Sequence, residues 1–248
     1  MKKNWQLILI MAVILALTSF MLSACGGGEK AVPTPKITPT PISTPPPTAT
    51  PEKPGAYVKN IHPADDAFVI ENYERNTTSN ESFLMVGLSG LPVDLIEHIS
   101  YLKFNLDNIP PEAKITKATF FIYEYFEGAI FSDSVEPVEI TLFSVEDDNW
   151  SESNINWFNK PASGEVLLKF FSKEEWNSFD ITAFAKNQFA EDKNVSLALR
   201  MTDPITKEPK EEYWVKYWSN EKENAPKQPY DESNEILQPY LEIIFEIK

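Results

Sequence analysis

The sequence of 248 residues contains little cysteine and little histidine, with Cys25, His62 and His98 as the complete set. A lone cysteine excludes an internal disulfide, and its place near the N-terminus leaves the rest of the chain without a thiol nucleophile or thiolate metal ligand. Neither histidine lies beside a recognisable nucleophile motif, and there is no phosphate-binding glycine loop. We therefore expect no enzymatic activity. A carboxylate pair such as Asp147 and Glu152 stays open, because glycoside hydrolysis needs only an acid and a base or nucleophile at a suitable separation.

Basic residues are also scarce, since 22 lysines and arginines face 37 acidic residues and give a formal net charge of -15. This balance argues against nucleic acid as a partner and against direct adhesion to anionic lipid. It is compatible with neutral glycans, and with anionic glycans where a basic patch is set apart on the surface.

The chain lacks an apolar run long enough for a free-standing membrane span, which needs about 20 residues. The run from Leu7 to Leu22 follows two lysines and leads into Ser23-Ala24-Cys25, a pattern typical of an export signal. Leu-Ser-Ala-Cys resembles the bacterial lipobox, whose cysteine sulfur takes up a diacylglycerol before the signal is removed. We expect a signal peptide at residues 1–24, lipidation of Cys25 and an extracytoplasmic location with the lipid anchor as the only membrane contact. The alternatives are an ordinary secretory signal and an uncleaved anchor.

Proline is concentrated after the lipobox, where nine of the 20 prolines fall between residues 26 and 54. Prolines at this density favour extended polyproline II and prevent a helix or sheet. We expect residues 25–54 to form a disordered Pro/Thr-rich tether. Residues 55–248 then form one domain, which is large enough to bury a single core.

Apolar residues in this domain alternate with a period of two, which is typical of half-buried β-strands. Leu102, Phe104 and Leu106 show the pattern, and similar stretches predict strands at 67–71, 83–87, 115–125, 138–145, 166–171, 195–202, 213–218 and 240–247. Residues 182–190 alone read as a helix, with Thr182 as its N-cap, and residues 220–238 read as a long loop. The expected fold class is all-β, a jelly-roll type β-sandwich with one short helix.

Five sequence segments recur in this order in one known family: YLKFNLDNIP (101–110), WSESNINWFNKP (150–161), SFDIT (178–182), LALR (197–200) and WSNE (218–221). They resemble a DNRLRE-type domain, also described as carbohydrate-binding module family 96. The resemblance implies a non-catalytic β-sandwich of jelly-roll type. It also implies a polysaccharide partner, with alginate-like uronate polymers among the ligands.

These observations together predict a cell-surface lipoprotein whose carbohydrate-binding module captures polysaccharide. The alternative is a structural or adhesive envelope protein that binds another protein. An exposed apolar patch in place of a basic aromatic one would distinguish that alternative.

The candidate sugar-binding residues lie in the predicted strand 213–218. If Val215 and Tyr217 point inward, then Trp214, Lys216 and Trp218 share the outer face. Indole rings stack on the apolar faces of sugar rings, and an ammonium group pairs with a uronate carboxylate or donates to hydroxyls. The sequence leaves the opposite register open, because both phases of this strand are aromatic.

Arg200, Lys103 and Tyr101 point outward by the same alternation on their own strands. If those strands are neighbours of 213–218, these side chains would add to a local basic and aromatic face.

Two further sets of residues are interpreted as structural, a pair of tryptophans and a group of acidic residues. Trp150 and Trp157 are predicted to be structural, closing the end of the sandwich core. No cofactor is firmly indicated. Oxygen ligands would suit a structural calcium ion without any EF-hand spacing, and they are supplied by Asp65, Asp66, Asp147, Asp148 and Glu152.

Overall fold

The computed structural model describes residues 54–74, 78, 81–91, 94–128, 137, 139–201, 213–220 and 237–248. The predicted signal peptide, Cys25 and nearly all of the predicted tether lie outside these residues. Most of the predicted loop at 220–238 lies outside them as well.

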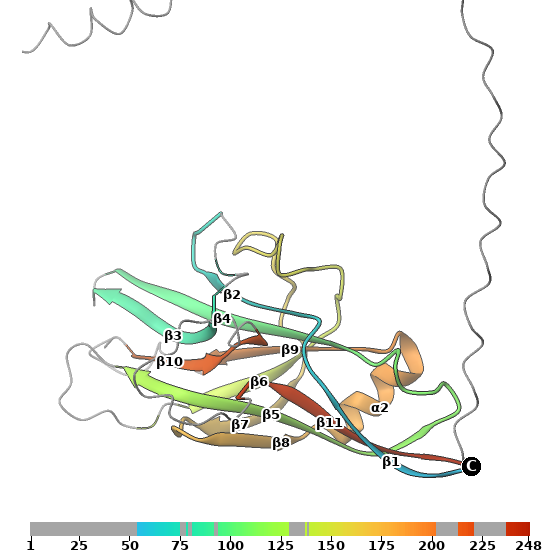
Figure 1. The fold of residues 1–248 in the computed structure, drawn as a ribbon. Helices are drawn as coiled ribbons and strands as arrows, with labels where there is room; N and C mark the ends of the chain where they lie inside the picture. Colours follow the sequence, from blue (N-terminus) through green and yellow to red (C-terminus); the bar gives the residue numbers. More distant parts are fainter. Residues whose placement is uncertain are drawn as a thin grey trace, which may run out of the picture. The chain divides into compact units, whose positions relative to one another are not determined.

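The described chain is built from β-strands (Figure 1). In chain order the strands are β1 (Gly55–Ile61), β2 (Asp65–Ile70), β3 (Phe83–Leu91), β4 (Asp94–Asn105), β5 (Lys114–Gly128), β6 (Glu139–Val145), β7 (Val166–Phe171), β8 (Trp176–Asp180), β9 (Asn194–Met201), β10 (Tyr213–Trp218) and β11 (Tyr240–Ile247). All their pairings are antiparallel.

Strand β5 joins two groups of strands. Its first part pairs with β11 and β8, and β1 pairs with β11; these four strands are called sheet A below. Its last part pairs with β10, which continues through β3, β4, β9 and β6 to β7, with β2 on the free edge of β4; this group is called sheet B. The long strand therefore belongs to both layers.

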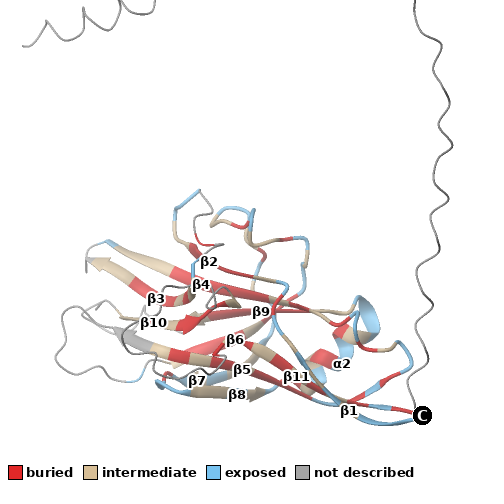
Figure 2. Ribbon diagram, viewed as in Figure 1, coloured by how far each residue is buried: buried red, intermediate tan, exposed pale blue. Residues whose placement is uncertain are grey.

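The main hydrophobic core lies between the two sheets, because it draws its side chains from both. Sheet A contributes Phe120 and Phe245, while sheet B contributes Leu84, Phe104 and Tyr217, and all five are almost completely buried. Figure 2 shows buried residues along the central parts of β4, β5, β9 and β11. Apolar burial of this kind supplies about 25 cal/mol per Å² removed from water and is the main source of stability in a domain without disulfides. Within the described residues, the structure confirms an all-β sandwich with one short helix.

A second, smaller cluster lies on the opposite face of sheet B. Tyr101 and Ile99 of β4 alternate with the core residues of that strand, and Ala198 does the same on β9. The loop at 146–165 lays Trp150 and Ile155 over them. This part of the outer face of sheet B is therefore covered by the chain itself.

The helix α2 (Thr182–Glu191) agrees closely with the predicted span, but its start differs from the prediction. The N-cap residue is Ile181, and no side chain caps the helix. Thr182 instead accepts a hydrogen bond from the backbone N–H of Ala118 at 2.9 Å. Its hydroxyl thus fastens the helix to β5 rather than to its own first turn.

Two strands were not predicted. Strand β1 has no fully buried residue along its length, and β8 is only five residues long. Both are held by backbone pairing to sheet A, which local periodicity does not reveal. Within the residues described, no helix is both long and apolar enough to cross a membrane.

Candidate functional site

Strand β10 runs between β3 and β5 and presents its residues in a defined register. Val215 and Tyr217 are fully buried in the main core, whereas Trp214 and Lys216 are half-buried on the other face. Trp214 lies opposite Gly87 of β3, and Lys216 lies opposite Met85. Of the two registers that the sequence allows, the structure has the one that turns Trp214 and Lys216 away from the core.

The Lys216 ammonium group lies among aromatic rings. Its Nζ is 4.2 Å from the ring centroid of Phe83 and 5.0 Å from that of Trp214. Cation–π contacts of this kind contribute about 0.5–1 kcal/mol at exposed sites and more when they are desolvated. Within the described residues, the structure shows no carboxylate within ion-pair distance of Lys216.

The charges around Lys216 act in opposite directions. Partial burial lowers the pKa of Lys216, and the Glu81 carboxylate opposes this shift. Burial, and then the charge of Lys216, lower the pKa of the neighbouring His98 to about 4. His98 is therefore neutral at neutral pH and leaves Lys216 as the cation of this surface. We call Trp214, Lys216 and Phe83 the Lys216 face.

Trp218 does not extend the Lys216 face, although the alternation places it on the same side of β10. Only 6% of its surface is exposed. Its ring stacks on Tyr125 of β5, with centroids 3.8 Å apart and planes 10° apart. The expectation of an exposed Trp218 is wrong, because a neighbouring strand supplies a ring that covers it.

Tyr101 is on the outer face of β4, as predicted, but it is not exposed. Its ring is 1% accessible and lies edge-on to Trp150, with centroids 5.9 Å apart. The Tyr101 hydroxyl donates a hydrogen bond to the carbonyl of Pro161 at 3.1 Å. Tyr101 therefore anchors the loop at 146–165 and offers no ring to a ligand. Trp150 is buried as expected, but in the second cluster rather than at an end of the main core.

Lys103 and Arg200 are both held by internal partners. The Lys103 ammonium lies 2.9 Å from a carboxylate oxygen of Asp65 and donates to the Trp150 carbonyl at 2.5 Å. The Arg200 guanidinium binds both carboxylate oxygens of Glu97, at 2.5 and 3.0 Å. The bidentate pair of Arg200 with Glu97 is stronger than a single hydrogen bond. Lys103 has an ion pair and a carbonyl acceptor, so both cations are committed within the protein.

The acidic residues proposed as calcium ligands are scattered among other partners. Asp65 pairs with Lys103, Asp66 accepts from the backbone N–H of Asn220 at 2.9 Å, and Asp148 accepts from the Ser196 hydroxyl. Asp147 accepts from the backbone N–H of Asn149. Among the residues that the structure describes, no three His, Cys, Asp or Glu side chains are grouped so that they could hold a metal ion.

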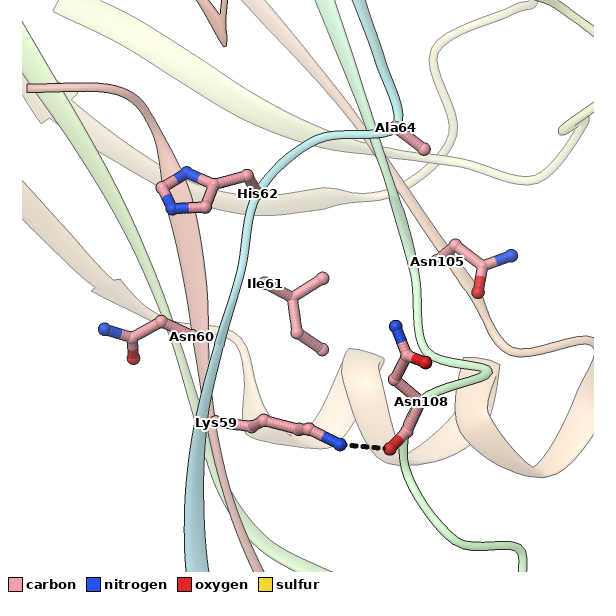
Figure 3. A pocket seen from close by; sticks show the side chains of 7 residues that line it. All are labelled: Lys59, Asn60, Ile61, His62, Ala64, Asn105 and Asn108. Atoms are coloured by element: carbon pink, nitrogen blue, oxygen red, sulfur yellow. Dashed lines mark hydrogen bonds between the residues drawn. The ribbon is translucent and has the colours of Figure 1, made fainter. Parts of the chain in front are cut away.

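A pocket of about 380 Å³ lies between β1 and the turn that follows β4 (Figure 3). The Lys59 ammonium donates to the Asn108 carbonyl across it. The side chains of Asn60 and His62 lie on the other side of the β1 backbone from Asn105 and Asn108. The pocket contains none of the predicted site residues, and no Trp, Tyr or Phe is among the described residues that line it.

The structure adds Phe83 to the candidate site, which the sequence did not single out. Phe83 alternates with the core residue Leu84 in the predicted strand at 83–87, and this places it on the outer face. The alternation was therefore a usable signal. The proximity of Phe83 to Lys216 could not be predicted from the sequence, because this proximity depends on the pairing of β3 with β10.

Comparison with known proteins identifies the family of the chain. The model of carbohydrate-binding module family 96 matches residues 57–230, which include every strand from β2 to β10. No curated protein matches the chain significantly.

Proposed function

The chain belongs to carbohydrate-binding module family 96, and on that premise we propose that its folded domain captures uronate-containing polysaccharide at the Lys216 face without a catalytic step. The finer parts of this proposal are the uronate, the position of the site and the absence of catalysis. The position of the site and the preference for uronate rest on the residues of the Lys216 face.

The main support for the position of the site is that the three predicted cations differ in their ion-pair partners. Lys103 and Arg200 are paired with Asp65 and Glu97. Lys216 has aromatic neighbours and, among the described residues, no paired carboxylate. A half-buried ammonium group has lost part of its hydration, so a ligand carboxylate restores stabilisation that water no longer gives.

Trp214 supplies the apolar half of the site. Its half-buried indole lies next to Lys216, so that one sugar ring can stack on the indole while its carboxylate approaches the ammonium. Aromatic stacking and a charge-assisted hydrogen bond together would favour uronate over neutral sugars.

The proposed cellular setting rests on the N-terminal sequence. An export signal that ends in Leu-Ser-Ala-Cys, followed by a proline-rich tether, suits a domain that is held at a membrane by a lipid on Cys25 and faces the extracytoplasmic space. Such a domain would hold polysaccharide close to the cell for separate enzymes or transporters.

The proposal is tested by electrophoresis of the purified protein through native gels that contain alginate or pectate, with and without calcium. We expect slower migration in these gels, and we expect the delay to disappear at high salt. Lys216→Ala and Trp214→Ala should each reduce the delay. Lys186→Ala, which removes an exposed lysine on α2, is the matched control and should migrate like the unchanged protein.

Two results would contradict the proposal. Undiminished retention in folded Lys216→Ala and Trp214→Ala variants would show that the site lies elsewhere. No retention by any polysaccharide would favour the protein-binding alternative.

A further inference from the structure

A second group of aromatic side chains lies on the outer face of sheet A, on the part of β5 that precedes the strand's pairing with β10. Phe121 and Tyr123 alternate with the core residues Phe120 and Ile122. Tyr240 of β11 lies opposite Phe121, and Trp176 of β8 lies opposite Tyr123. We call Phe121, Tyr123, Trp176 and Tyr240 the sheet A strip.

The four rings contact one another and form a continuous apolar surface. The rings of Phe121 and Tyr240 are stacked, with centroids 4.6 Å apart and planes 11° apart. Trp176 stands edge-on to the other three, with centroid distances of 5.5 Å to Tyr123, 5.6 Å to Tyr240 and 6.5 Å to Phe121. Aromatic pairs prefer these offset and edge-to-face arrangements, so the rings support one another in place.

The strip is partly open to solvent. All four side chains are half-buried, and none belongs to either buried cluster. On sheet B the outer face of β4 and β9 is instead covered by the loop at 146–165. Adjacent rings of this size are each comparable to one sugar ring, and the group extends across three strands, so it suits a chain of sugars better than a single one.

The charge beside the strip is negative. The Glu242 carboxylate lies on the outer face of β11, two residues from Tyr240, and it adds to the effect of burial in raising the pKa of the Tyr240 hydroxyl. A carboxylate in this position repels a uronate and accepts hydrogen bonds from neutral sugar hydroxyls. The strip therefore differs in charge from the Lys216 face.

We propose that the sheet A strip is a second glycan-binding surface, which stacks the rings of an uncharged polysaccharide chain against Trp176, Tyr240 and Phe121. Tyr123 completes the apolar edge of the surface. The proposal does not depend on uronate binding at the Lys216 face, because the two surfaces use different residues and opposite charges.

The test is electrophoresis of the purified protein through native gels that contain mixed-linkage β-glucan or glucomannan, both uncharged, beside gels with alginate. We expect retention by at least one neutral polymer, and we expect this retention to survive high salt. Trp176→Ala should weaken it about fivefold or more. Trp176→Leu, which keeps an apolar side chain but removes the ring, should have the same effect and guards against a variant that fails to fold.

Two matched controls separate this surface from others. Phe171→Ala removes an aromatic side chain that is 63% exposed on β7, outside the strip, and should leave neutral retention unchanged. Trp214→Ala should also leave it unchanged. Absence of retention by both neutral polymers, or retention that survives Trp176→Leu, would overturn the proposal. Alginate retention in the parallel gels reports separately on the Lys216 face.

Discussion

The indole of Trp218 lies flat against the phenol ring of Tyr125, with the two centroids 3.8 Å apart and the planes 10° apart. This stack joins β10 to β5 on the outer side of the sandwich, so Trp218 acts as a structural residue while Trp214, four residues earlier, stays half-buried. The two tryptophans should therefore respond differently to the same substitution.

Trp218→Ala should destabilise the domain by about 3 kcal/mol or more, because it removes a large buried side chain and leaves a cavity. Trp214→Ala should cost clearly less, since its ring is already partly in water. Urea unfolding of the two variants measures the difference. Equal losses of stability would contradict the assignment of Trp214 to the binding face.

Tyr101→Phe should lower stability by about 1 kcal/mol, because the hydroxyl that donates to the Pro161 carbonyl is lost while the ring stays in place. Alginate retention should be unchanged, since the ring is buried beneath the loop at 146–165. If the variant folds with full stability but no longer binds alginate, Tyr101 would be a binding residue and its assignment as a structural residue would be wrong.

Gly87→Ala should disrupt the pairing of β3 with β10. Gly87 has a φ of +132°, and a Cβ there would lie 2.3 Å from the carbonyl oxygen of Tyr213. Strain of this kind costs on the order of 1–3 kcal/mol, and the displaced β10 should also weaken alginate retention. Gly55→Ala is the control, because its nearest neighbour is the Tyr57 ring at 3.7 Å. The same loss in both variants would argue against a specific role for the β3–β10 contact.

His98 should make stability fall in mild acid. Its pKa is about 4 in the folded protein against 6.5 for an unperturbed histidine, so the unfolded state binds more protons between these values. The contribution is complete above pH 6.5, is lost as the pH falls toward 4, and amounts to about 3 kcal/mol at most. Urea unfolding at pH 7 and pH 4.5 should show a smaller loss in His98→Gln than in the unchanged protein.

The unchanged protein and the His98→Gln variant have to be compared, because the titration of Asp148 changes the stability of the fold with pH in the direction opposite to that of His98. Burial raises the pKa of Asp148 to about 6, so its contribution to stability declines as the pH rises from about 4 to 6. Both proteins contain Asp148, and its effect cancels in the difference. An equal loss in the two proteins would mean that His98 is protonated normally in the fold.

Cys25→Ala should abolish lipid attachment. Cells that express the unchanged protein in the presence of a labelled fatty acid should yield a labelled chain that partitions into detergent, whereas the variant should be unlabelled and partition into water. Label that persists in the variant would rule out Cys25 as the modified residue.

Most strands were predictable from local alternation, and β7, β10 and β11 agree with their predicted bounds residue for residue. The sequence allowed two registers for strand β10, and the structure has the one in which Val215 and Tyr217 point into the core. What decides the phase is the pairing of β10 with β3 and β5, since the strand lies between them. Periodicity within six residues contains no information about those partners.

The errors at the candidate site have the same origin. Tyr101 was placed on the correct face of β4, but the loop that covers it begins more than 40 residues later in the chain. Trp218 was expected to be exposed, and the ring that covers it belongs to β5. Alternation predicts on which face a side chain lies, whereas exposure depends on what long-range folding brings to that face.

The shared strand β5 has a consequence for how the two proposed surfaces communicate. A sandwich whose layers touch only through side chains can open one layer while the other persists. Here one backbone contributes hydrogen bonds to both ladders, so opening either layer withdraws support from the other. The domain should then unfold in a single cooperative transition, with slow amide exchange reporting one common free energy in β9 and β11. A ligand that binds either face would thereby protect the amides of both.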